Sequence, residues 1–216
     1  MNVNEANDLL MRGALDAPGL FPRLEALQDS PFRFRTEFGL ERLPEEPGLL
    51  LIRGARQYGK STWLESELRD TIKSYGGGSA FYINGDELAD AEALVRVVRG
   101  LVPLFRADAG VRRLFIDEIT AVKDWERGLK RLLDAGELRR VLVVTTGSKA
   151  TDLRRGAERL PGRKGRLART HYWFTPVSFA EFARVAGAKL GADLFPAYMI
   201  AGGCPVACAE IAAHGR

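Results

Sequence analysis

The stretch that decides the fold runs from residue 48 to residue 62 and reads GLLLIRGARQYGKST. Its first part is a short apolar run, which is typical of a β-strand buried on both faces. Its second part fits the pattern Gly-x4-Gly-Lys-Ser, from Gly54 to Ser61, and a helical pattern follows over residues 60–74. A glycine-rich loop between a strand and a helix directs backbone N–H groups and a helix N-terminus to one point. The sequence therefore predicts a phosphate-binding loop of the Walker A type.

The residue types in this loop have physical reasons. Gly54 and Gly59 are expected to adopt positive φ angles and to let the backbone approach a ligand closely. Lys60 would reach the β- and γ-phosphates during catalysis, and the Ser61 hydroxyl would contact Mg²⁺. The expected nucleotide-binding residues are nine consecutive positions: Gly54, Ala55, Arg56, Gln57, Tyr58, Gly59, Lys60, Ser61 and Thr62.

Apolar runs and helical patterns alternate along the rest of the chain. Further strands are predicted at residues 79–85, 112–118, 140–148 and 170–176. Helices are predicted at residues 86–102 and 123–135, and the last helices should begin near Ser178 and Phe195. Ser178 and Glu181 have the spacing of a capping box. This alternation predicts an α/β fold with a parallel sheet covered on both faces. Residues 1–48 hold two weaker helical stretches, near 5–15 and 20–28.

Acidic and hydroxyl side chains end two of these strands. The strand 112–118 ends in Asp117 and Glu118, the pattern of a Walker B motif. Asp117 would hold Mg²⁺ together with Ser61, and Glu118 would act as the general base on the attacking water. The strand 140–148 ends in TTGS, so Thr146, with Ser148 as a second candidate, would sense the γ-phosphate. The other interpretation of TTGS is an ordinary turn that leaves the strand.

Composition limits the class of protein. The chain has 216 residues, of which 46% are hydrophobic, enough for one core with a small appendage. We expect a cytoplasmic protein without a membrane span, because no apolar run approaches ~20 residues and the N-terminus does not resemble a signal peptide. Residues 139–169 carry ten Lys or Arg against two acids. This excess fits either a solvated surface or an anionic partner, such as nucleic acid bound through residues 149–169.

Five segments, in this order and at these spacings, resemble a known family. They are IRGARQYGKSTWL (52–64), FYING (81–85), LFIDEITAVKDWERGLKRLLDAG (114–136), VLVVTTGSKATDLRRGAERLPGRKGR (141–166) and FTPVSFAEF (174–182). The chain resembles the prokaryotic AAA-type P-loop ATPases of the AAA_14 group, whose loop often reads GPRQVGKTT. Ala55 and Tyr58 differ from that loop at variable positions.

The resemblance implies a three-layer P-loop fold with a five-stranded parallel sheet in the order 5-1-4-3-2. It implies ATP and Mg²⁺ as ligands, and a homo-oligomer or a protein as partner. Arg163 would be the arginine that stabilises the transferring phosphoryl group, and Pro205 would pack against the adenine. The expected organisation is a lead-in at 1–48, an ATPase domain at 49–185 and the start of a helical lid at 186–216, truncated relative to family members.

Three functions from different classes remain open at this point. The first is Mg²⁺-dependent ATP hydrolysis to ADP and phosphate, used as a conformational switch. The second is a small-molecule kinase on the same fold, which Glu118 disfavours because it is placed for water. The third is a nucleic-acid-binding module with a nucleotide-dependent basic loop. The basic stretch supports this function, whereas the small number of interleaved aromatic residues for base stacking counts against it.

Overall fold

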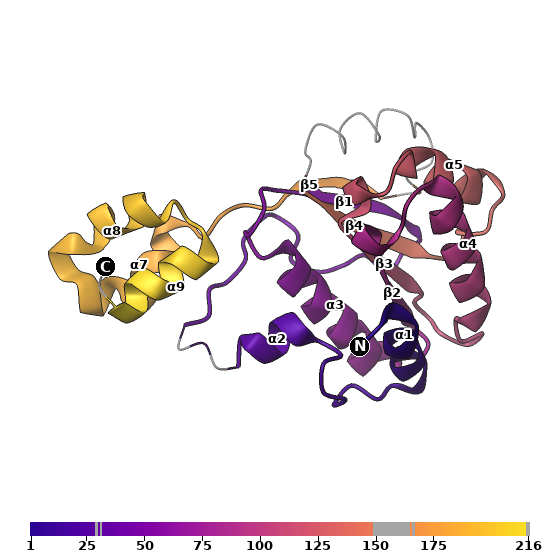
Figure 1. Ribbon diagram of the computed structural model, residues 1–216, viewed down its shortest axis with the longest axis horizontal. Coiled ribbons are helices and arrows are strands. Elements are labelled where there is room, and N and C mark those ends of the chain that lie inside the picture. Colours follow the sequence, from indigo (N-terminus) through magenta and orange to yellow (C-terminus); the bar gives the residue numbers. More distant parts are fainter. Residues whose placement is uncertain (29, 31, 149–164, 166, 215–216) are drawn as a thin grey trace.

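Parallel strands form the central sheet of the computed structural model, which describes residues 1–28, 30, 32–148, 165 and 167–214 (Figure 1). Within these residues the strands are β1 (Gly48–Arg53), β2 (Ala80–Asn84), β3 (Arg113–Asp117), β4 (Leu142–Gly147) and β5 (His171–Trp173). Their order in the sheet is β2-β3-β4-β1-β5, and every pair is parallel. This confirms the order 5-1-4-3-2. β4 inserts between β1 and β3, with Leu50 opposite Val144 and Phe115 opposite Val144.

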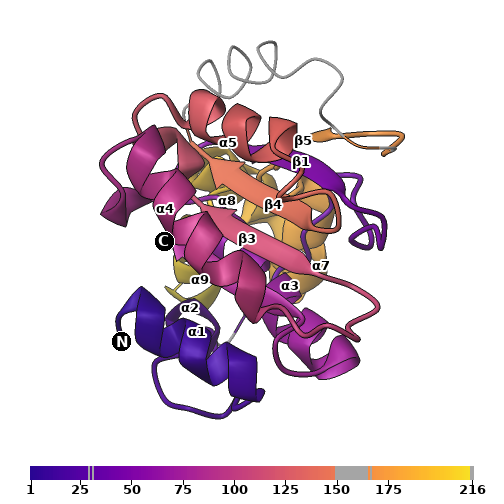
Figure 2. The ribbon, with the colours of Figure 1, turned by 90° about the vertical axis from the view of Figure 1, so that its right-hand side faces the viewer.

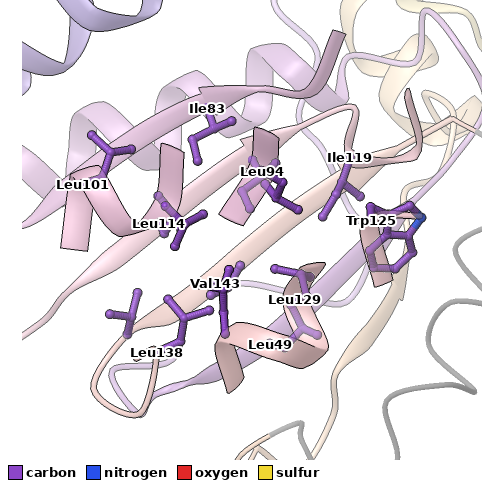
Figure 3. Close-up of a cluster of buried hydrophobic side chains, with 14 of the residues drawn as sticks. Leu49, Ile83, Leu94, Leu101, Leu114, Ile119, Trp125, Leu129, Leu138 and Val143 are labelled. Carbon is purple, nitrogen blue, oxygen red and sulfur yellow. The ribbon is translucent and has the colours of Figure 1, made fainter. Parts of the chain in front are cut away.

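Helices cover both faces of the sheet. One face carries α4 (Ala91–Leu101) and α5 (Trp125–Asp134), and the other carries α3 (Lys60–Tyr75). Alternate residues of β1 supply the two cores: Leu49 and Leu51 pack towards α4 and α5, whereas Leu50 and Ile52 pack towards α3. Figure 3 shows the first of these clusters, with Leu94 and Leu129 reaching the sheet from the two helices. The uninterrupted apolar run in the sequence is the consequence of this double burial.

The N-terminal residues join the α3 face of the sheet. They form α1 (Val3–Arg12) and α2 (Pro22–Ala26), which Figure 2 shows below the sheet, with α5 above it. Both helices end before the stretches predicted from the sequence, and α1 ends where Gly13 adopts a left-handed conformation. The Asn7 carboxamide docks α1 on the edge strand β2: its Nδ2 donates to the Tyr82 carbonyl, and its Oδ1 accepts from the Tyr82 N–H, both at 2.8 Å.

The C-terminal residues form a helical unit that lies to one side of the sheet (Figure 1). It comprises α7 (Phe179–Leu190), α8 (Leu194–Ala201) and α9 (Pro205–His214), which share their own apolar cluster. The capping box predicted for α7 is only half formed. Ser178 accepts from the Glu181 N–H, but the Glu181 carboxylate accepts from the Arg35 N–H at 2.7 Å and pairs with Arg184. That carboxylate therefore fixes the N-terminal segment to the helical unit.

The helix predicted at residues 86–102 begins later than its apolar pattern suggests. Residues Gly85–Glu87 form a 3₁₀ turn, in which the Asn84 side chain accepts from the Asp86 N–H. Asp90 then caps α4 by accepting from the Ala93 N–H at 2.9 Å. Side-chain capping decided the boundary, as is usual for Asn and Asp. Among the described residues, no helix combines the length and the apolar character that a membrane crossing requires.

Candidate nucleotide-binding site

The loop predicted to bind phosphate lies where β1 ends and α3 begins, at the carboxyl edge of the sheet. Gly59 has a φ of 96° and precedes the first residue of α3. Gln57 has a φ of 64°, a conformation that a residue with a side chain adopts at a cost of about 1 kcal/mol or more. Such left-handed residues turn successive N–H groups inward and create an anion-binding concavity. The loop therefore stores strain at the position where phosphate binding is predicted.

Gly54 has a different role from the one predicted. It does not have a positive φ; the residues of this loop that do are Gln57 and Gly59. A Cβ at Gly54 would lie 2.7 Å from the Phe174 carbonyl oxygen and 3.0 Å from the Phe174 Cβ. The first glycine of the motif is thus required for space against the chain that leaves β5. A Cβ at Gly59, in contrast, would meet no atom within 4 Å.

Lys60 is buried and folded over its own loop. Its Nζ donates to the carbonyl oxygens of Gly54 at 3.0 Å and Ala55 at 2.8 Å, and lies 3.9 Å from Oε1 of Glu118. An ammonium group has three N–H donors, so one remains for an anion in the loop. Burial lowers the pKa of Lys60, and the charges of Glu118 and Asp117 oppose this effect.

Asp117 ends β3 as a buried carboxylate, and the Thr146 hydroxyl links it to the backbone of Glu118. Thr146 Oγ1 donates to Asp117 Oδ1 and also accepts from the Glu118 N–H at 3.0 Å. The Glu118 N–H lies 3.2 Å from Asp117 Oδ1 as well. Thr146 is fully buried, so its hydroxyl fixes the Asp117 carboxylate. Its predicted contact with the γ-phosphate stays a prediction.

Glu118 points its carboxylate across the end of β4. Its backbone is left-handed, with φ 46° and ψ 46°. Oε2 accepts from the N–H and from the hydroxyl of Ser148, both at 3.0 Å. Ser148 thus holds the carboxylate that the sequence predicts as the general base. Lys60, Asp117, Glu118 and Thr146, which the sequence predicted separately, lie in one connected network.

The groups at this edge have the chemistry that Mg²⁺ prefers. Mg²⁺ binds hard oxygen ligands and usually takes one or two protein groups together with phosphate oxygens and water. Ser61 is the second residue of α3, and Asp117 presents Oδ2 away from its bond with Thr146. The open space beside Gly59 allows a phosphate to approach. These residues fit a magnesium nucleotide.

Two predicted residues stand apart from this network. Arg163 lies outside the described residues. Pro205 is the first residue of α9, a position that suits its fixed φ. The preceding residue brings this element to the loop, because Cys204 Sγ lies 3.9 Å from the Gln57 carbonyl oxygen. The contact of Pro205 with adenine stays a prediction.

Sequence reasoning missed two charged residues beside Asp117. Glu65 lies four residues after Ser61, on the same face of α3, and is almost fully buried. Its Oε2 accepts from the N–H groups of Arg23 and Leu24, at 3.0 and 3.2 Å. The spacing of four residues from Ser61 could have placed Glu65 on the same helix face as the predicted site, whereas nothing in the sequence indicated Arg23. Arg23 Nη2 lies 3.8 Å from Asp117 Oδ2.

A strand, a glycine-rich loop and a helix, with acidic residues at the end of a second strand of the same parallel sheet, define the P-loop class of α/β nucleotide-binding folds. The model of the AAA_14 family, described as an AAA domain, matches residues 46–183. The chain therefore belongs to the AAA_14 family. No curated protein matches the sequence.

Solved structures with the same fold include two proteins of Thermotoga maritima. One is a single-residue variant of RuvB, with 15% identity, a TM-score of 0.52, and coverage of 77% of this chain and 53% of the RuvB chain. The other is a protein related to the γ subunit of DNA polymerase III, with 11% identity, a TM-score of 0.52, and coverage of 90% and 59%. The chain thus spans between half and two thirds of each of these structures.

Proposed function

We propose that the chain binds ATP with Mg²⁺ in the loop 54–62, hydrolyses it to ADP and phosphate, and uses the cycle as a conformational switch. The observation that carries the proposal is the network at the carboxyl edge of the sheet. It joins Lys60, from the phosphate loop, to Glu118 at 3.9 Å, and joins Asp117 to Thr146. Membership of the AAA_14 family supports a nucleotide as the ligand.

Each residue has a distinct part in this proposal. The N–H groups of the loop and the remaining N–H of Lys60 bind the β- and γ-phosphates. Ser61 and Asp117 hold Mg²⁺, which neutralises charge on the phosphates when it is bound. Glu118 orients a water and accepts its proton, with Ser148 fixing the carboxylate. Arg163 supplies positive charge to the transferring group, and Pro205 packs against the adenine.

The conformational part of the proposal follows from the contacts of the loop. Gln57 touches Cys204, just before α9, so a change in the loop is transmitted directly to the C-terminal helices. We assign residues 1–48 to a lead-in, 49–185 to the ATPase domain and 186–216 to the start of a lid. A neighbouring copy or a protein partner would receive the movement.

The test is ATP binding and phosphate release by the wild type, Lys60→Ala and Glu118→Gln in Mg²⁺, without any added phosphate acceptor. Lys60→Ala should lose binding, and Glu118→Gln should bind ATP but release phosphate at least ~100-fold more slowly. Lys73→Ala, an exposed lysine in the last turn of the same helix, is the matched control and should behave as wild type. Phosphate transfer only after an acceptor is added would favour the kinase, and equal binding by Lys60→Ala would end the proposal.

A second candidate function is nucleic-acid binding, which one surface favours. A hollow of about 410 Å³ lies at the edge of the sheet opposite the phosphate loop, and its lining includes Arg112, Arg139 and Arg140 together with Glu137 and Phe105. Arginines around a hollow suit phosphate backbones. Replacing Arg139 and Arg140 together with Gln should reduce the salt dependence of DNA binding by about two phosphate contacts. Arg96 and Arg127, on α4 and α5, serve as the control pair; an equal effect there would exclude the hollow.

A further inference from the structure

Arg23 is placed beside the nucleotide site by a specific anchor. It is the second residue of α2, and Phe21, which precedes this helix, makes no side-chain capping bond. The Glu65 carboxylate supplies the cap instead, by accepting from the N–H groups of Arg23 and Leu24. Arg23 Nε also lies 3.8 Å from Glu65 Oε1. The backbone and the side chain of Arg23 are therefore both directed by a residue of α3, the helix that follows the phosphate loop.

The guanidinium lies near the Asp117 oxygen that accepts neither of the hydrogen bonds from Thr146 and Glu118. Asp117 Oδ1 is engaged by Thr146 and by the Glu118 N–H. Asp117 Oδ2 lies 3.8 Å from Arg23 Nη2. The side chain of Asp117 is 4% exposed and that of Arg23 is 48% exposed. A buried carboxylate thus has a cation at the boundary with solvent.

We propose that Arg23 is a positioning residue whose guanidinium competes with Mg²⁺ for Asp117 Oδ2. The proposal rests on the proposed function, because it concerns the metal of the same nucleotide site. Without Mg²⁺, Arg23 provides the counter-charge that a buried carboxylate requires. A dication held at Asp117 would repel the guanidinium, which has the Glu65 carboxylate as its second partner. The lead-in segment thereby responds to metal binding.

Charge explains why the competition falls on Arg23 and not on Lys60. Lys60 is committed to the carbonyl oxygens of its own loop and lies near Glu118 rather than near Asp117 Oδ2. Arg23 has a second carboxylate, Glu65, within reach on the other side. The guanidinium of Arg23 would oppose the binding of a dication at Asp117, and its partial exposure would reduce this opposition. We expect a change of ~3–10-fold in the Mg²⁺ concentration that is needed.

The experiment measures ADP binding while Mg²⁺ is varied, and ADP binding in EDTA. Arg23→Gln should lower the Mg²⁺ concentration at half-saturation by ~3–10-fold, while its ADP affinity in EDTA stays within twofold of wild type. Arg23→Lys keeps the charge and should remain close to wild type. Arg12→Gln, an exposed arginine of α1, is the matched control. A merely structural role of Arg23 would change the unfolding midpoint without moving the Mg²⁺ dependence.

A second measurement needs no substitution in the test protein. The Nε–H NMR signal of Arg23, identified by its loss in Arg23→Gln or by sequential assignment, should shift when Mg²⁺ is added to the ADP complex. It should not shift when ADP is added in EDTA. This inference is wrong if the NMR signal does not shift, or if folded Arg23→Gln needs as much Mg²⁺ as wild type or more. The proposed function would still stand in that case, provided that wild type binds the nucleotide and Lys60→Ala does not. Absence of wild-type Mg²⁺–ADP binding overturns both.

Discussion

Replacing Thr146 with Val tests the hydroxyl that joins Asp117 and the Glu118 N–H. The two side chains are almost equal in volume, so the substitution removes hydrogen bonds and leaves the packing of β4 intact. Asp117 would lose a donor to a buried charged oxygen, worth about 1.5–3 kcal/mol, and the Glu118 N–H would keep only its 3.2 Å contact with Asp117. We expect the free energy of unfolding to fall by about 2–4 kcal/mol.

The neighbouring residue is a matched control. Thr145 is equally buried on the same strand, and its hydroxyl donates to the neutral Leu50 carbonyl oxygen at 3.1 Å. Thr145→Val should cost only about 1 kcal/mol, because that carbonyl is a neutral acceptor. Urea denaturation without Mg²⁺ or nucleotide, with equal m-values for the three proteins, measures both differences. Equal losses for the two variants, or a larger loss for Thr145→Val, would refute the assigned role of the Thr146 hydroxyl.

Two further predictions concern Glu65 and Gly54. Burial raises the pKa of Glu65 from 4.5 to about 7, so the folded chain binds a proton at this residue more tightly than the unfolded chain. The free energy of unfolding should therefore fall as pH rises from about 5 to 8, and in Glu65→Gln this fall should be smaller by roughly 2 kcal/mol. Parallel curves of unfolding free energy against pH for the two proteins would contradict the reasoning. Gly54→Ala should destabilise the fold by about 1–3 kcal/mol, because the new Cβ would meet Phe174. The control is Gly100→Ala in α4, where a Cβ would meet no atom within 4 Å and should stabilise the fold by up to about 1 kcal/mol. Denaturation curves measure both effects, and an unchanged stability of Gly54→Ala would exclude the steric role.

The sheet and its order could be predicted because the signals are local and repeated. The apolar run 48–52 has to be a doubly buried strand, and the loop pattern after it fixes the direction of the next helix. Strand pairing then followed from the family resemblance, which supplied the position of β4 between β1 and β3. The helix boundary at Ala91 was missed because the apolar pattern continues across residues 86–90, where the caps at Asn84 and Asp90 decide the conformation.

The candidate site was predictable where a motif names the residue and unpredictable where a contact spans the chain. Lys60, Asp117 and Glu118 carry their signals in the adjacent sequence. Arg23 meets Asp117 from almost a hundred positions away, and no pattern in FPRLEA indicates this. The steric requirement for glycine at position 54 could not be predicted either. Phe174, which leaves no room for a Cβ at Gly54, is distant from it in the sequence.

The docking of α1 has a consequence for biosynthesis. The Asn7 carboxamide imitates a peptide group and occupies the hydrogen-bonding groups of Tyr82 on the outer strand of the sheet, across 75 positions of sequence. During translation α1 is made long before its partner strand exists, so it cannot be secured until β2 has left the ribosome and paired with β3. Until α1 docks on β2, the N–H and C=O groups of Tyr82 at this outer edge are free and can pair with another chain. Substitutions at Asn7 should therefore act most strongly on the yield of soluble protein, through the competition between docking and aggregation.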